Sequence, residues 1–105
     1  MCPVVGEVKH VHLGASISLR CRSVFYDSVL WYYNELDSDK PYILYWDEIF
    51  TKDPLRFQVT RPNSSRGTFD LSISNVQLSD SGVYRCTEHS GQHPAEVRYL
   101  LTVTG

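Results

Sequence analysis

Cysteine and histidine are the residues of this chain best suited to redox or metal chemistry. The three cysteines, Cys2, Cys21 and Cys86, are far apart in the sequence, and none belongs to a C-x-x-C pair. This spacing does not support a zinc site or a thioredoxin-type dithiol. The simplest pairing is one long-range disulfide and one unpaired cysteine. Such a disulfide requires an oxidising compartment.

Two of the four histidines, His10 and His12, are two residues apart in a segment with strand-like composition. Their side chains should therefore lie on the same face of that strand. Two imidazoles can begin a metal site, but no third ligand is evident nearby in the sequence. We expect no metal and no cofactor.

Nucleophilic catalysis is not supported by the serines of this chain. Ser79, Ser81 and Ser90 have no evident partnership with histidine and aspartate. The chain also has no G-x-S-x-G elbow, no phosphate-binding loop and no H-E-x-x-H motif. We therefore expect a protein that binds a partner and is not an enzyme.

The composition of the chain is that of one ordinary globular domain. It has 105 residues, of which 42% are hydrophobic and 21% charged, and its formal net charge is -2. This charge gives no overall attraction to nucleic acid or to anionic membranes. No apolar run approaches the roughly 20 residues that a membrane-spanning helix needs.

The hydrophobic pattern predicts an all-β protein. Short runs of alternating apolar and polar residues are separated by turn residues, and no segment shows a sustained helical stripe. The corner from Leu78 to Gly82 is expected to hold at most a short helical turn. The first strand region is expected to break near Gly6 into one or two edge strands. About nine strands are predicted, at residues 4–11, 16–22, 29–34, 42–46, 48–51, 55–60, 68–74, 83–88 and 97–104.

The chain contains Cys21, Trp31 and Cys86, and a run from Asp80 to Cys86 that reads D-S-G-V-Y-R-C. Through these residues, the sequence resembles the immunoglobulin fold across its length. The resemblance implies a two-sheet antiparallel sandwich with a Cys21–Cys86 disulfide packed against Trp31. It also implies a tyrosine corner, in which the Tyr84 hydroxyl returns to the backbone near Asp80. Alternation places Leu71 and Leu101 in the same core.

The sequence separation of 65 from Cys21 to Cys86 leaves room for two extra strands, so the chain is similar to the variable type of immunoglobulin domain. This type implies an ion pair between Arg56 and Asp80. The last strand lacks the Phe/Trp-Gly-x-Gly bulge of antigen-receptor chains, which disfavours that class. The resemblance instead implies an immune-type cell-surface receptor or coreceptor.

In domains of this type, the sheet with the extra strands usually carries the recognition face. Alternation from the inward residues predicts an outward patch rich in the residue types that concentrate interface energy. We expect it to bind a protein ligand, or alternatively a second copy of the chain in cell adhesion. The predicted patch consists of Leu30, Tyr32, Asn34, Tyr42, Leu44, Trp46, Arg85, Thr87, Arg98 and Leu100.

The loops at one end of the sandwich are a second candidate site, in which histidines could titrate near neutral pH. Its residues are Phe25, Tyr26, Asp27, His89, Gln92 and His93. Asn63 begins the sequon Asn-Ser-Ser and is expected to be glycosylated. Cys2 is expected to form an interchain bond, to pair beyond this chain, or to stay free.

The ends of the chain bear on where the protein resides. Met1 is not followed by the charged and apolar regions of a signal peptide, so it looks like an expression start. We expect an extracellular ectodomain of a single-pass membrane protein, with Gly105 close to a stalk, membrane helix or further domain. Membrane contact would then come only through segments outside this chain.

Overall fold

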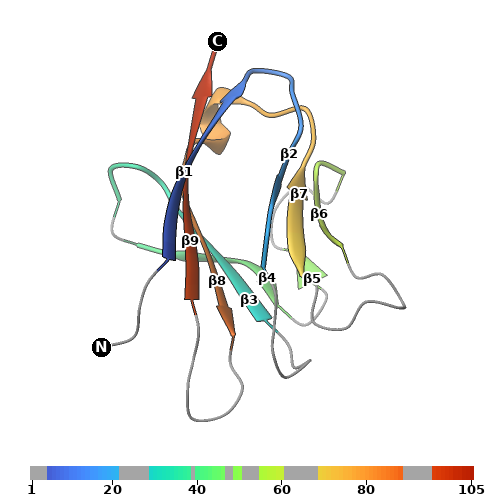
Figure 1. Ribbon diagram of the computed structural model, residues 1–105, viewed down its shortest axis with the longest axis vertical. Coiled ribbons are helices and arrows are strands. Elements are labelled where there is room, and N and C mark those ends of the chain that lie inside the picture. The colour runs from blue at the N-terminus through green and yellow to red at the C-terminus, as the bar shows by residue number, and fades with distance from the viewer. Residues whose placement is uncertain are drawn as a thin grey trace.

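The computed structural model describes residues 5–21, 29–38, 40–46, 49–50, 55–60, 69–88 and 96–105. Within these residues the chain forms nine strands in two sheets that pack face to face (Figure 1). The all-β, two-sheet architecture predicted from the alternating pattern is therefore confirmed.

The larger sheet has six strands in the order β1-β9-β8-β3-β4-β5. All its neighbours are antiparallel except β1 and β9, which run parallel along the full length of β1. In Figure 1 these two strands lie side by side at one edge, with the C-terminus just beyond β9. The strands span Val5–His12 (β1), Val29–Asn34 (β3), Tyr42–Trp46 (β4), Ile49–Phe50 (β5), Gly82–Glu88 (β8) and Glu96–Thr104 (β9).

The smaller sheet has three antiparallel strands in the order β2-β7-β6. Its alternation is simple: the side chains that face the larger sheet are aliphatic and aromatic, and those that face away are polar, among them Ser18, Gln58, Asp70 and Ser72. One short 3₁₀ helix, Leu78–Asp80, precedes β8 and corresponds to the predicted helical turn. The strands span Ile17–Leu19 (β2), Phe57–Thr60 (β6) and Asp70–Ile73 (β7).

Several predicted strand boundaries are wrong, and the strand predicted at residues 16–22, for example, ends at Leu19. The first strand does not break near Gly6, because the backbone pairing of the parallel β1–β9 ladder continues from Val5 to His12. The strand predicted from residue 55 begins only at Phe57, since Leu55 and Arg56 form a turn. That turn brings the Arg56 carbonyl against the Ser74 amide, which donates to it at 2.9 Å.

The core is built around the predicted disulfide. Cys21, just after β2, and Cys86 on β8 are bonded across the two sheets, with their Cα atoms 6.3 Å apart. Trp31 lies opposite Cys86 in the β3–β8 ladder, is fully buried, and donates its indole N–H to the Phe69 carbonyl at 3.0 Å. Leu71 and Leu101 are also fully buried in the same cluster.

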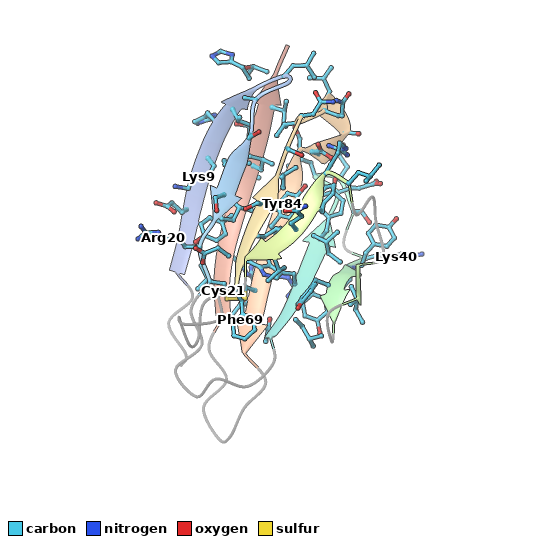
Figure 2. All side chains as sticks on the ribbon, turned by 90° about the vertical axis from the view of Figure 1, so that its right-hand side faces the viewer. Lys9, Arg20, Cys21, Lys40, Phe69 and Tyr84 are labelled. Carbon is cyan, nitrogen blue, oxygen red and sulfur yellow. A yellow bond between two sulfur atoms is a disulfide. The ribbon has the colours of Figure 1, made fainter. Side chains whose placement is uncertain are left out.

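Inward-facing tyrosines tie the sheets to the corner before β8. The Tyr84 hydroxyl donates to the Asp80 carbonyl at 2.6 Å, which is the bond of a tyrosine corner. Burial raises the pKa of Tyr84, and the nearby charge of Asp80 raises it further. The Tyr33 hydroxyl lies 3.1 Å from the Ser79 carbonyl and 2.8 Å from that of Ser81. Figure 2 shows Tyr84 between the sheets, with Lys9 and Arg20 at the surface.

Glycine is required where β8 begins. Gly82 has a φ of +156°, and a Cβ atom there would lie 2.4 Å from the Asn34 carbonyl oxygen and 2.7 Å from the Tyr33 ring. Real Cβ atoms do not approach so closely, so this glycine allows β8 to come directly against the end of β3.

The tyrosine corner gives a stability prediction. Tyr84→Phe should lower the free energy of unfolding by about 1 to 2 kcal/mol, because the buried Asp80 carbonyl loses its donor. Urea titration measures this change. Tyr42→Phe is the matched control, since Tyr42 is 55% exposed, and it should change stability by less than about 0.5 kcal/mol. Equal effects of the two substitutions would contradict the assignment.

Candidate binding surface

The face of the six-stranded sheet that points away from the smaller sheet is called the outer face here. Side chains that are buried on the inner side fix which neighbours point outward, because successive residues of a strand alternate between the two faces. These buried residues are Trp31, Tyr84, Cys86, Tyr99 and Leu101. The described side chains of the outer face come from five strands. They are Val8, Leu30, Tyr32, Asn34, Ile43, Val83, Arg85, Thr87, Glu96, Arg98, Leu100, Thr102, His10 and His12.

The strand registers arrange the centre of this face in rows that cross the sheet. The middle row runs Ile43, Tyr32, Arg85 and Arg98, from β4 to β9. On one side is the row Leu30, Thr87 and Glu96. On the other side is the row Asn34, Val83, Leu100 and Val8. The middle of the face is therefore cationic and aromatic, and one flank is mainly aliphatic.

Two residues predicted for this patch are on the wrong side. Trp31 pairs with Tyr45 and Tyr32 pairs with Ile43, so Leu44 is the extra residue of a β-bulge. The bulge lets two consecutive side chains, Leu44 and Tyr45, be buried together, at 2% and 4% exposed. Simple alternation along β4 fails at this point.

Tyr42 is the second correction. It pairs directly with the buried Tyr33, and paired residues share a face, so Tyr42 lies on the inner side at the end of the sheet. The two rings stack with their centroids 6.3 Å apart. Tyr42 is exposed, but it does not belong to the outer face. Ile43, which is 44% exposed, takes the place predicted for its neighbours.

The remaining predicted residues of the patch occupy the outer face, apart from one that cannot be placed. The backbone of Trp46 ends β4, but its side chain lies outside the described part of the structure. The predicted loop and modification residues also lie outside the described residues. These are Phe25, Tyr26, Asp27, His89, Gln92, His93, Asn63 and Cys2.

Sequence reasoning missed several members of the outer face. Val83 and Glu96 could have been found, because alternation from Cys86 and Tyr99 places both outward. Val8 could have been found only by knowing that β1 pairs in parallel with β9, which brings it opposite Leu100. Ile43 could not have been found, since no signal in the sequence marks the bulge at Leu44.

Arg85 is the most constrained polar residue of the outer face. Its guanidinium carbon lies 5.0 Å from the centre of the Tyr32 ring, a cation–π contact across β3 and β8. Its terminal Nη1 is 3.6 Å from Glu96 Oε1. Its Nε atom is buried and has no hydrogen-bond partner. The tyrosine ring therefore holds this charge in place while its hydrogen-bonding capacity is only partly used.

Glu96 accepts from two hydrogen-bond donors and forms an ion pair with a third group. Arg98 Nε donates to Glu96 Oε2 at 2.9 Å, and the Thr87 hydroxyl lies 3.4 Å from Oε1. Arg85 contributes the ion pair, at 3.6 Å. Arg98 is 48% exposed at its side chain, so this end of the cluster is open to solvent.

A hollow of about 470 Å³ opens beside the two arginines. Polar and apolar groups both line it, as expected for a surface that contacts another protein. No cluster of three metal-ligating side chains occurs in the part of the chain that the structure describes. The hollow is lined by Asn34, Glu35, Leu36, Ser38, Pro41, Val83, Arg85 and Arg98.

The class of protein follows from this geometry together with the fold. Two sheets joined by a disulfide against a buried tryptophan, with a tyrosine corner and extra strands β4 and β5, define an immunoglobulin-type sandwich. The family model of the immunoglobulin V-set domain matches residues 5–104. The chain belongs to the immunoglobulin V-set family, whose members are typically binding modules without catalytic activity.

A comparison of structures agrees with this family. The chain is similar to a structure entitled "Crystal Structure of the RIG-5 IG1 homodimer", with a TM-score of 0.73 and 21% sequence identity. The match covers 94% of this chain and 91% of the other. At this identity the likeness shows the fold alone. No curated protein matches the sequence significantly.

The Arg56–Asp80 ion pair and the ion pairs of Glu96 should contribute differently to stability. Asp80 is fully buried and accepts from Arg56 at 2.7 and 3.2 Å and from the Gln77 amide at 2.7 Å. Glu96 is only partly buried. Asp80→Asn should therefore cost about 3 kcal/mol, because a largely buried arginine loses its counter-charge.

Glu96→Gln is the matched comparison and should cost no more than about 1 kcal/mol, since partly exposed pairs contribute little. Urea denaturation of both variants measures the difference. If Glu96→Gln were as costly as Asp80→Asn, the outer-face cluster would be a structural element of the fold.

Proposed function

We propose that this V-set domain is the ligand-binding part of an immune-type cell-surface receptor or coreceptor. It recognises a protein ligand through the outer face of the six-stranded sheet, through the end loops that include residues 23–28 and 89–94, or through both. The proposal includes a single-pass membrane protein and a glycan on Asn63. Family membership and the disulfide support an extracellular or cell-surface location.

The observation that carries this proposal is the contrast between the two outward surfaces. The six-stranded sheet presents Tyr32, Ile43 and Arg85 together, and such residues supply most of the energy in protein interfaces. The three-stranded sheet presents Ser18, Ser72 and Gln58 in one row. Serine is depleted in interfaces, so the first surface is the better candidate.

Cell adhesion by self-association is the second candidate. The structurally similar RIG-5 IG1 domain is described as a homodimer. Self-association through the same outer face would bury the same aliphatic flank and the same aromatic residue. No helix among the described residues is long and apolar enough to cross a membrane.

Binding of a fluorescent tetramer of the domain to intact cells tests the proposed function. The tetramer is titrated on a panel of cell types until a binding cell is found. Tyr32→Ala and Ile43→Ser should each reduce the apparent affinity by more than about tenfold, because each removes a central contact.

Gln58→Ala, on the outward side of the smaller sheet, is the matched control and should bind as the wild type does. Thermal unfolding confirms that all variants are folded. A tetramer whose binding depends on Gln58 and is indifferent to Tyr32 would place recognition elsewhere on the domain.

Sedimentation equilibrium separates the two candidates. A receptor for a different protein should sediment as a monomer over the concentration range of the experiment. The adhesion candidate instead requires a mass that rises with concentration and returns to the monomer in Tyr32→Ala. A concentration-independent monomer removes self-adhesion from consideration.

A further inference from the structure

We propose that Arg85 and Arg98, beside the hollow of the outer face, form a receptor for a carboxylate side chain of the protein partner. This inference rests on the proposed function and names the chemistry of its ligand. The partner would present an aspartate or glutamate surrounded by apolar residues. The carboxylate enters the hollow and the apolar residues cover the row of Val83 and Leu100.

The site has two guanidinium groups for the one carboxylate that pairs with them. Two guanidinium groups share one carboxylate, that of Glu96, which also accepts from the Thr87 hydroxyl. A guanidinium has five N–H donors in a planar fork that matches a carboxylate. One carboxylate cannot satisfy two such forks, so the cluster has an excess of both positive charge and donors.

Arg85 is already held in position in the domain. It stacks over Tyr32, and its side chain is only 23% exposed. Its buried Nε lacks an acceptor, and buried polar groups in folded proteins are nearly always paired. An arginine that is fixed before binding loses little conformational freedom when its partner arrives. Among the described residues, this Nε is a donor of the cluster that remains without an acceptor.

Arg98 is accessible from solvent. Its side chain is 48% exposed, and its terminal amino groups have no partner in the described part of the chain. Its neighbour across the β1–β9 ladder is Gly6, where a Cβ atom would meet nothing within 4 Å. No side chain of β1 therefore covers Arg98 at that position.

These contacts define how a carboxylate would bind. An incoming carboxylate accepts two hydrogen bonds from the free amino groups of Arg98. Glu96 is then less strongly held by Arg98 and can shorten its ion pair with Arg85, whose Nη1 is 3.6 Å away. The ligand thus pairs with one arginine directly and completes the pairing of the other through Glu96.

Glu35 is a carboxylate that lines the hollow itself. It is exposed and follows the last residue of β3, beside the inner-face Tyr33. Burial and then the charge of Glu35 raise the pKa of Tyr33. Within the described part of the chain, both arginines form their ion pairs with Glu96, and neither forms one with Glu35.

A second copy of the chain fits this site less well than a different, acidic protein. A two-fold contact centred on the middle row would bring four guanidinium groups against two Glu96 carboxylates. Like charges that meet across an interface oppose association. The excess positive charge therefore favours a partner that supplies its own carboxylate.

Nuclear magnetic resonance of the whole isotope-labelled chain tests the inference directly through the Nε–H signals of arginine. The probes are two capped tripeptides, leucine–glutamate–leucine and leucine–glutamine–leucine, which have the same shape and differ in charge. The glutamate peptide should shift the signals of Arg98 and Arg85 in a saturable manner. It should bind about tenfold more tightly than the glutamine peptide.

Variants show which arginine is responsible. Arg98→Lys keeps the charge but removes the fork, and should weaken the glutamate peptide about fivefold. Arg20→Lys is the matched control on another part of the surface and should leave the affinity unchanged (Figure 2). The backbone spectrum confirms that both variants are folded. Equal shifts with both peptides, or equal losses in both variants, would overturn the inference.

The cell-binding experiment distinguishes this failure from failure of the proposed function. If tetramer binding requires Tyr32 and Ile43 but the Arg98→Lys tetramer binds as well as the wild type, the outer face is functional and the carboxylate receptor is wrong. If the glutamate peptide binds at Arg98 but no substitution on the outer face changes tetramer binding, the carboxylate-binding site is supported and the proposed function is wrong.

Discussion

The Cys21–Cys86 bond, packed against Trp31, is the interaction on which the rest of the structure depends. It closes a separation of 65 residues, which in the chain-entropy description contributes about 4 kcal/mol. Its geometric effect matters more for function. By fixing Cys86 and Trp31 inward at adjacent positions of β8 and β3, it fixes the phase of both strands. Arg85 and Tyr32 are thereby held outward and opposite each other.

Electrostatic interactions serve different purposes on the two sides of the six-stranded sheet. On the inner side, Asp80 is fully buried and satisfied by three hydrogen bonds from Arg56 and the Gln77 amide. On the outer side, Glu96 is divided among donors that it cannot all satisfy. A complete network stabilises a fold, whereas an incomplete one leaves free energy available for binding. This difference is why we assign structure to the first and recognition to the second.

Much of the fold could be predicted from the sequence because it depends on local alternation and on a few large side chains. The positions of β3, β8 and β9, the disulfide and the tyrosine corner all follow from Cys21, Trp31, Tyr84 and Cys86. The errors arise where tertiary pairing overrides alternation. The bulge at Leu44 reverses the expected faces in β4, and the hollow depends on the β3–β4 turn, whose path no single-strand pattern encodes.

The composition of the outer face separates affinity from selectivity. Its aliphatic row, from Val83 through Leu100 to Val8, can gain free energy from burial against almost any apolar surface. Arg98 cannot, because a partner without a carboxylate would bury its terminal amino groups without hydrogen-bond acceptors. For such a partner, the free energy lost at Arg98 offsets the free energy gained by burying the aliphatic row. Selectivity at this face therefore comes mainly from the cost imposed on wrong partners, and that cost increases as the apolar contact around the arginines becomes tighter.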